Sequence, residues 1–385
     1  MSDAAPERSD PATQQGPLVE GAAGDSFEPI PKPLAEWLDE LRISGDAAPS
    51  EPSEPVNAQA NIAADVPLLS ASRAAMACEF EVLLNRGQHP GSVDRAVEAL
   101  DEVQRLEGLL SIYRQQSDLS TVNRFAHRNP VPVQPDTMRM LQIGEAIGKL
   151  TGGAFDLTAG KLSSLWGFSR RAGKMPDADE IQKSLECVGL QMVDLLPTEG
   201  QVRMQREGIE LNPGGIGKGY ALDRAAEHLR NHGVGDFMIH GGQSSIVAFG
   251  DRQHSAVCGG WKVAVRHPLR PEITVGTLRL RDQALGTSGS GKQFFHFRGR
   301  RYSHIIDPRT GYPADGLLSA TVVVPSGTVA DALATALFVM GPEAALEFCR
   351  KTPWLGAILL KNQIGSQKLQ IEVVNLTAEA WEQAI

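Results

Sequence analysis

The spacing of hydrophobic residues changes repeatedly along this 385-residue chain, and these changes limit the folds that it can adopt. Residues 76–82 alternate apolar and polar side chains, which is typical of a half-buried strand. Other stretches, near 92–110, 140–150, 220–232 and 328–340, repeat every three to four residues and predict helices. Strands and helices follow no regular β-α-β order. The pattern therefore favours an α+β fold, with mixed or antiparallel sheets and packed helices in one body over residues 70–385.

Local signals sharpen this prediction at several element ends. Ser92 is predicted to cap the first helix. The helix before Gly152-Gly153 is predicted to end there, because glycine adopts the left-handed cap conformation. Hairpin turns are predicted at 298–300 and 361–363. The buried face of the first helix is predicted to consist of Ala96, Val97, Leu100, Val103 and Leu110.

Residues 1–65 have a different composition, dominated by Pro, Ala, Ser, Asp and Glu. Such a segment cannot bury enough apolar area to offset the entropy lost on ordering, so we predict a disordered, acidic arm. Inside it, residues 33–43 carry the apolar stripe of a short amphipathic helix. Two interpretations stay open for this stripe, a helix that docks on the body or a partner and a transient helix.

The composition excludes several functional classes. The net charge of −9 argues against binding a nucleic acid or an anionic membrane surface. The four cysteines lie far apart without a C-x-x-C pair, so neither a zinc site nor a disulfide framework is predicted. No apolar stretch of about 18 residues predicts a transmembrane segment. No signal peptide is recognised at the N-terminus, and we expect a cytoplasmic protein.

Residues 211–220, L-N-P-G-G-I-G-K-G-Y, form a glycine-rich turn that leads into a helix. Glycines let the backbone approach a ligand, and free N–H groups at a helix start attract phosphate. A phosphate-binding loop and a tight packing turn both explain this segment. Residues 286–292 imitate a P-loop, but Gln293 replaces its Ser or Thr and a hairpin follows, so we reject an NTPase. Thr287 and Ser288 remain candidate phosphate-binding hydroxyls.

Two further segments carry chemically useful side chains. In residues 302–313, an alternating strand breaks into a Pro/Gly turn, where His304 is suited to proton transfer and Arg309 to phosphate binding. An ordinary surface turn explains the same residues. In residues 328–337, Asp331 and Thr335 lie one helical turn apart and offer oxygen ligands for Mg²⁺. The alternative, which these residues taken singly favour, is that Thr328 caps the helix with Asp331 at its third position.

Together and in this order, these segments resemble the ApbE family of FAD:protein FMN transferases. The resemblance covers residues 75–345. The matching residues include Gly153–Thr158 with Asp156, Leu165–Phe168, Gly214–Tyr220 with Gly215, Asp223, Gly241-Gly242, Thr287–Gly289, Ser303–Gly311, and Ala330–Ala332 with Thr335.

The resemblance implies a cleft that binds FAD, with Mg²⁺ on its pyrophosphate. It implies that Asp331, Thr335 and the Gly217 carbonyl hold the metal and that His304 is the base. Tyr113 and Met76 match residues beside the flavin. FMN would pass to a Ser or Thr of an acceptor protein, in a short Ser/Thr-containing motif, and AMP would leave. From the chemistry of the residues alone, we add Lys218 and Arg309 as cations that screen the phosphates.

The sequence departs from the family pattern at three places. Asn212 and Gln243 stand where the family usually has acids, and Ala77-Cys78 replaces Gly-Thr. Because Asp331, Thr335 and His304 are retained, we predict that activity is retained. Many relatives are exported lipoproteins, whereas no lipobox cysteine is found here. Two alternative functions stay open, an FAD pyrophosphatase that releases free FMN and a flavin-storage protein without turnover.

Overall fold

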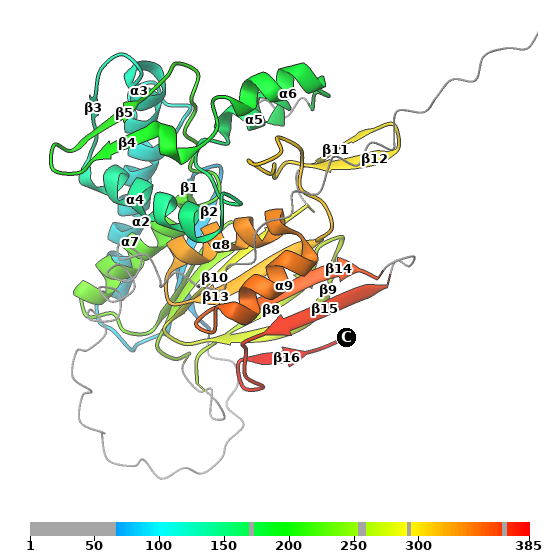
Figure 1. Ribbon diagram of the computed structural model, residues 1–385. Helices are drawn as coiled ribbons and strands as arrows, with labels where there is room; N and C mark the ends of the chain where they lie inside the picture. Colours follow the sequence, from blue (N-terminus) through cyan, green and yellow to red (C-terminus); the bar gives the residue numbers. More distant parts are fainter. Residues whose placement is uncertain (1–66, 169–172, 253–258, 291–293, 364–367) are drawn as a thin grey trace, which may run out of the picture.

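The computed structural model describes residues 67–168, 173–252, 259–290, 294–363 and 368–385. Its centre is an eight-stranded sheet with the strand order β1-β2-β6-β7-β10-β13-β14-β15 (Figure 1). Every neighbouring pair in this sheet is antiparallel. The strands span Leu69–Ala75 (β1), Cys78–Leu84 (β2), Phe237–Gly241 (β6), Ser245–Phe249 (β7), Gln283–Gly289 (β10), Ser319–Val324 (β13), Gly356–Asn362 (β14) and Leu369–Val374 (β15).

Helices cover one face of this sheet. The helix α8 packs on β10 and β13, and α7 packs on α8, α2, β6 and β7. Figure 1 shows α8 and α9 lying across the sheet, with α2, α4 and α7 beside them. The helices span Ser92–Leu110 (α2), Asp118–Phe125 (α3), Pro135–Leu150 (α4), Gly160–Leu165 (α5), Ala178–Leu185 (α6), Gly217–Asn231 (α7), Gly327–Met340 (α8) and Pro342–Lys351 (α9), with a 3-10 turn at Leu190–Met192 (η2).

A smaller sheet covers the opposite face. Its strands β8 (Trp261–His267), β9 (Arg270–Leu280) and β16 (Trp381–Gln383) are antiparallel. Trp261 and Leu278 pack there against Ile358 and Leu360 of the large sheet. The large sheet thus separates two hydrophobic clusters, one under the helices and one under the small sheet. Sheets of both sizes with helices on one side confirm the predicted α+β class.

Two further small sheets complete the fold. The first joins β3 (Val131–Pro132), β4 (Val193–Leu196) and β5 (Gln201–Met204), next to α3 and α4. The second is the hairpin of β11 (Phe294–Phe297) and β12 (Arg300–Ser303). Its turn carries Arg298 and Gly299 at positive φ, which confirms the hairpin predicted at 298–300. The strands β14 and β15 also pair, but Lys361 and Asn362 are paired residues of β14, so the turn lies after them rather than at 361–363.

The sequence predictions need three local corrections. The strand predicted from Met76 begins at Cys78, because Met76 and Ala77 form a hairpin turn with φ values of 48° and 59°. The cap of α2 is Gly91 rather than Ser92. Val97, predicted to be buried, is 40% exposed, because it lies at the edge of the apolar stripe that faces the sheet.

Other predicted ends agree with the structure. The helix α4 ends before Gly152 and Gly153, both at positive φ, and Gly153 N–H donates to the carbonyl of Gly148 at 2.9 Å. The helix predicted at 33–43 lies outside the described residues. Among the helices that the structure describes, none is long and apolar enough to cross a membrane.

Candidate active site

A cleft of about 1270 Å³ opens at the rim of the large sheet. Its walls come from the turn between β1 and β2, the glycine loop before α7, the turn between β6 and β7, the end of β10, and α8. On the far side of the sheet, β8 and the turn after it form another wall. The cleft brings together the predicted residues Met76, Tyr113, Asp156, Gly215, Gly217, Lys218, Thr287, Ser288, His304, Asp331 and Thr335.

Asp331 is held in the second turn of α8, facing the cleft. Its side chain is 4% exposed, and Lys218 Nζ lies 3.2 Å and 3.3 Å from its two oxygens. Gly219 N–H donates to the same carboxylate at 3.2 Å. Ser245 Oγ donates to it at 3.0 Å. A buried carboxylate with a cation beside it is therefore a fixed feature of this wall.

The residue that caps the N-terminus of α8 is not the predicted one. Ser326 is the cap, since its hydroxyl accepts a hydrogen bond from Val329 N–H at 3.3 Å. The alternative in which Thr328 caps the helix is therefore wrong. Thr328 donates instead, through both its N–H and its hydroxyl, to the buried carboxylate of Asp223 at 2.9 Å and 2.6 Å. Ser326 and Gly327 donate to the same group at 2.7 Å and 2.6 Å.

Asp223 thus lies away from the cleft lining and anchors α8 to α7. Four protein donors surround its oxygens, and burial raises the pKa of its carboxyl group. In this position it orients the helix that carries Asp331. It is not placed to touch a ligand in the cleft.

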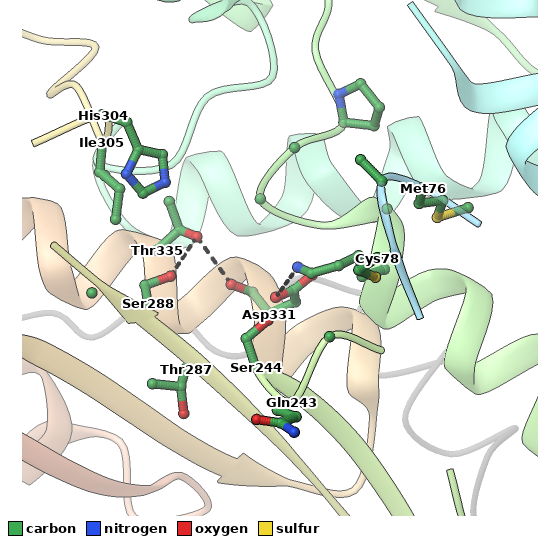
Figure 2. Close-up of a pocket in the computed structure, with 18 of the residues that line it drawn as sticks. Met76, Cys78, Gln243, Ser244, Thr287, Ser288, His304, Ile305, Asp331 and Thr335 are labelled. Carbon is green, nitrogen blue, oxygen red and sulfur yellow. Dashed lines mark hydrogen bonds and ion pairs between the residues drawn. The ribbon is translucent and has the colours of Figure 1, made fainter. Parts of the chain in front are cut away.

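Thr335 presents its hydroxyl to the cleft one turn after Asp331. The hydroxyl donates to the carbonyl of Asp331, one turn earlier in the same helix, at 3.1 Å. It also lies 3.0 Å from Ser288 Oγ. Figure 2 shows the row of Ser288, Thr335 and Asp331 along α8 and β10. Thr287, the other predicted hydroxyl, pairs with Thr321 Oγ1 at 3.0 Å.

The glycine loop lies directly against Thr335. A Cβ atom on Gly215 would lie 3.1 Å from the Thr335 hydroxyl and 3.1 Å from the ring of Phe155. Asn212 Oδ1 accepts a hydrogen bond from Gly214 N–H at 2.9 Å. The side-chain amide therefore closes this turn, and Gly217 follows as the first residue of α7.

His304 follows β12 and lines the cleft with Ile305 (Figure 2). The ring of Phe168 packs edge-on to it, at a centroid distance of 6.4 Å. Arg309, predicted to bind phosphate, lies outside the cleft lining. Its guanidinium group binds both carboxylate oxygens of Asp307 at 2.9 Å and 2.8 Å, and the hydrogen bonds with Asp307 raise the pKa of Arg309.

The flavin-side residues of the resemblance also line the cleft. Met76 N–H donates to Glu107 Oε1 at 2.8 Å, which fixes the turn between β1 and β2. Tyr113 is 74% exposed and offers an open aromatic face. Asp156 is engaged by Thr158, and burial raises the pKa of its carboxyl group.

The sequence analysis missed several residues in the cleft lining or directly behind it. Ser245 is buried behind the lining, where it binds Asp331. It follows the recognised Gly241-Gly242 pair by only a few residues, and that pair was the available signal. His240 pairs with Glu81 across β2 and β6 at 3.0 Å and also lines the cleft. Lys262 lines it from β8. The side chains of His240 and Lys262 reach the cleft through strand pairings that no local pattern reveals.

Comparison with known proteins agrees with this geometry. The ApbE family matches residues 76–359. A protein of Klebsiella pneumoniae strain 342 named FAD:protein FMN transferase is 30% identical over 260 residues, covering 67% of this chain and 79% of that protein. Proteins of the same name from Escherichia coli K12 and Treponema pallidum are 30% and 32% identical, over 69% and 68% of this chain and 78% and 76% of their own lengths.

Solved structures agree with the fold as well. The Pseudomonas stutzeri flavinyl transferase ApbE in its apo form superposes with a TM-score of 0.71 at 25% identity, over 80% of this chain and 95% of that one. The ApbE protein of Thermotoga maritima gives a TM-score of 0.72 at 26% identity, over 80% and 97%. The protein therefore belongs to the ApbE family and is an enzyme of the transferase class.

Proposed function

We propose that this protein is a Mg²⁺-dependent FAD:protein FMN transferase. It would cleave the pyrophosphate of FAD, join FMN through a phosphoester bond to a Ser or Thr of an acceptor protein, and release AMP. The names of the relatives support this reaction. The observation that carries it is the shared cleft, in which Asp331 and Thr335 stand beside the glycine loop with His304 in the same lining.

The residues present fit a magnesium ion. The carboxylate of Asp331, the hydroxyl of Thr335 and the carbonyl of Gly217 are the hard oxygen donors that this ion prefers. The ammonium group of Lys218 lies within 3.3 Å of the same carboxylate, so the ion would have to displace it from Asp331 and leave it to pair with phosphate oxygens. When bound, the ion would neutralise charge on the pyrophosphate.

The remaining lining residues suit the other parts of FAD. The hydroxyls of Thr287 and Ser288 and the ammonium of Lys218 would bind non-bridging phosphate oxygens. The exposed ring of Tyr113 would pack on the isoalloxazine, next to Met76. Because Asp307 engages Arg309 outside the cleft lining, we assign the screening of phosphate charge to Lys218.

His304 would act as the base for the acceptor. Its ring nitrogen would accept the proton of the acceptor hydroxyl as that oxygen attacks the FMN phosphorus. One P–O bond forms between the acceptor oxygen and the FMN phosphorus, and the bond from that phosphorus to the bridging pyrophosphate oxygen breaks. AMP leaves with the bridging oxygen and the electron pair of the broken bond. The other residues hold the reacting groups in line and exclude water.

One assay tests this function. The protein is incubated with FAD, Mg²⁺ and an acceptor protein that carries a Ser/Thr-containing flavinylation motif. Flavin fluorescence on the denatured acceptor, with an equal amount of AMP, is the expected result. Free FMN without labelled acceptor would identify a pyrophosphatase, and unchanged FAD would identify a storage protein.

The metal assignment has its own test. We expect Asp331→Ala to lower the transfer rate by more than about 100-fold, beyond what loss of a supporting contact costs at metal sites. Asp194→Ala, an acid that binds Gln205 on the surface, serves as the control and should leave the rate unchanged. Full activity of Asp331→Ala would refute the assignment.

A further inference from the structure

A cluster of metal-binding side chains lies at the opposite end of α7 from the cleft. Glu98 of α2 meets His228, in the last turn of α7, and His232, the residue that caps the end of this helix, and one ligand atom from each lies within 4.8 Å of the others. We propose that these three residues bind a transition-metal dication of the Zn²⁺ type. The proposal stands apart from the proposed transferase activity, because none of the three residues lines the cleft.

The separations suit such an ion. His228 Nε2 lies 3.1 Å from Glu98 Oε2. Ligands at about 2.0–2.1 Å from a tetrahedral zinc are separated by roughly 3.3 Å. The two atoms therefore already stand at close to the edge length of a zinc site, and an ion could enter between them with little movement.

The two histidines are presented by one helix face. Residues four apart lie one above the other on a helix, and here the ring centroids are 4.3 Å apart with an angle of 32° between the planes. His232 Nδ1 lies 2.8 Å from the carbonyl oxygen of His228. A histidine that donates through one ring nitrogen to a carbonyl keeps the lone pair of the other for a metal.

The charge at the site is set by Arg95. Its guanidinium lies 2.8 Å from both oxygens of Glu98. A carboxylate paired with a guanidinium group at this distance is ionised, as a metal ligand must be. The same guanidinium competes with a metal for it, so Arg95 should weaken binding.

The donor set selects the type of metal. Two imidazole nitrogens and one carboxylate oxygen suit Zn²⁺, Co²⁺, Ni²⁺ or Cu²⁺, whereas Mg²⁺ prefers oxygen ligands alone. Three protein ligands leave a fourth position for water. The ion would tie the last turn of α7 to α2. The 15 residues of α7 place this site about 20 Å from Gly217 at its other end.

The sequence analysis predicted no zinc site, and the proposal therefore departs from that expectation. His228 and His232 are four residues apart within a predicted helix, and this spacing was the overlooked signal. Glu98 comes from a helix more than a hundred residues earlier. Only the packing of α2 against α7 brings it to the pair.

The test is a Zn²⁺ titration of the metal-stripped full-length protein by calorimetry, in excess Mg²⁺. Co²⁺ absorption serves as a second readout of nitrogen ligation. We expect one strong site, weakened at least tenfold in Glu98→Gln, His228→Ala and His232→Ala. Arg95→Gln should bind several-fold more tightly. His127→Ala is the matched control, a histidine near the acid Glu207 elsewhere, and should bind as the parent does.

Each other outcome overturns the proposal. It is wrong if the parent protein shows no Zn²⁺ site under these conditions. It is also wrong if the double variant His228→Ala/His232→Ala, folded by circular dichroism, retains the strong site. Transfer activity is measured in parallel and should be unchanged in the double variant, so a failure here is distinct from a failure of the proposed transferase function.

Discussion

At the scale of single residues, the groups that we propose for phosphate binding and for proton transfer come from different segments of the cleft wall. Asp331, Lys218 and Ser245 form a hydrogen-bonded group on one wall. His304 belongs to a different segment, after β12, and packs against Phe168. A change at His304 should therefore leave the phosphate side of the site intact.

We predict that His304→Gln lowers the rate of FMN transfer by about 10²–10⁴-fold, the range for loss of a general base. Binding of FAD should change little, because the group of residues around Asp331 is untouched. Flavin fluorescence on the acceptor measures transfer, and quenching of flavin fluorescence on titration measures binding. A variant that transfers FMN at the parent rate would remove His304 from the mechanism.

Asp136 shows how one acid can join three helices. It lies in the first turn of α4, forms an ion pair with Arg105 of α2, and accepts a hydrogen bond from Tyr220 of α7 at 2.8 Å. Burial opposes its ionisation, but the hydrogen bonds from Arg105 and Tyr220 outweigh it and hold its pKa below the ordinary value. The ionised form is therefore favoured by folding.

We predict that Asp136→Asn lowers the free energy of unfolding at pH 7 by about 1–3 kcal/mol. An acid whose pKa is lower in the folded state stabilises the fold at pH values above its pKa in the unfolded state, about 3.9. That stabilisation is lost as the pH falls through the pKa of the folded state. Urea unfolding of parent and variant from pH 7 to pH 3 should show the difference shrinking. Asp194→Asn serves as the control, and an unchanging difference would contradict the assignment.

At the scale of elements, glycines set how closely α8 approaches its neighbours. A Cβ on Gly286 of β10 would lie 2.4 Å from the backbone of Ala330. A Cβ on Gly219 of α7 would lie 2.0 Å from the carbonyl of Gly327. Contacts this short exclude any larger residue unless the helix moves. The position of Asp331 is therefore fixed by backbone packing on two sides.

We predict that Gly286→Ala destabilises the protein by about 1–3 kcal/mol, since the added methyl group must push α8 away from β10. Transfer should fall as well, because Asp331 moves with the helix. Gly108→Ala in α2 is the matched control, with nothing within 4 Å of the added carbon. It should stabilise by about 0.5–1 kcal/mol. Thermal unfolding of both variants measures the two changes in stability, and equal changes would contradict the prediction.

Helices and hairpins were the features that the sequence predicted best. Local periodicity and turn residues predicted the helices α7 and α8 and the β11–β12 hairpin. They did not predict the cap of α8, because Ser326 and Thr328 are both good capping residues. The choice between them depends on Asp223, which is distant in sequence. The same holds for Ser245, whose partner Asp331 is 86 residues away.

At the scale of the whole molecule, the walls of the cleft differ in how far they could be predicted. The walls from α8 and the glycine loop carry recognisable motifs. The wall from β8 and the turn after it, including Lys262 and His267, carries none. It reaches the cleft only because the small sheet packs on the far face of the large one. A long-range packing of this kind leaves no local pattern in the chain.

We propose that residues 70–385 form the catalytic domain without the arm. The first described strand, β1, begins at Leu69 and pairs along its length with β2. A chain of residues 67–385 should therefore unfold within about 0.5 kcal/mol of the full-length protein and transfer FMN at the same rate. Calorimetry and the fluorescence assay test both. A clear loss of either would show that the arm takes part in the fold or in the site.

The rim position of the cleft has one more consequence. Its lining includes Phe155 and Leu110 from the cluster under the helices, and Leu285 and Ile246 from the cluster under the small sheet. A dinucleotide bound there would contact both clusters at once. Its binding free energy would then stabilise both layers, and neither layer could unfold before the nucleotide dissociated. With the nucleotide bound, we therefore expect the two layers to unfold together in one cooperative transition.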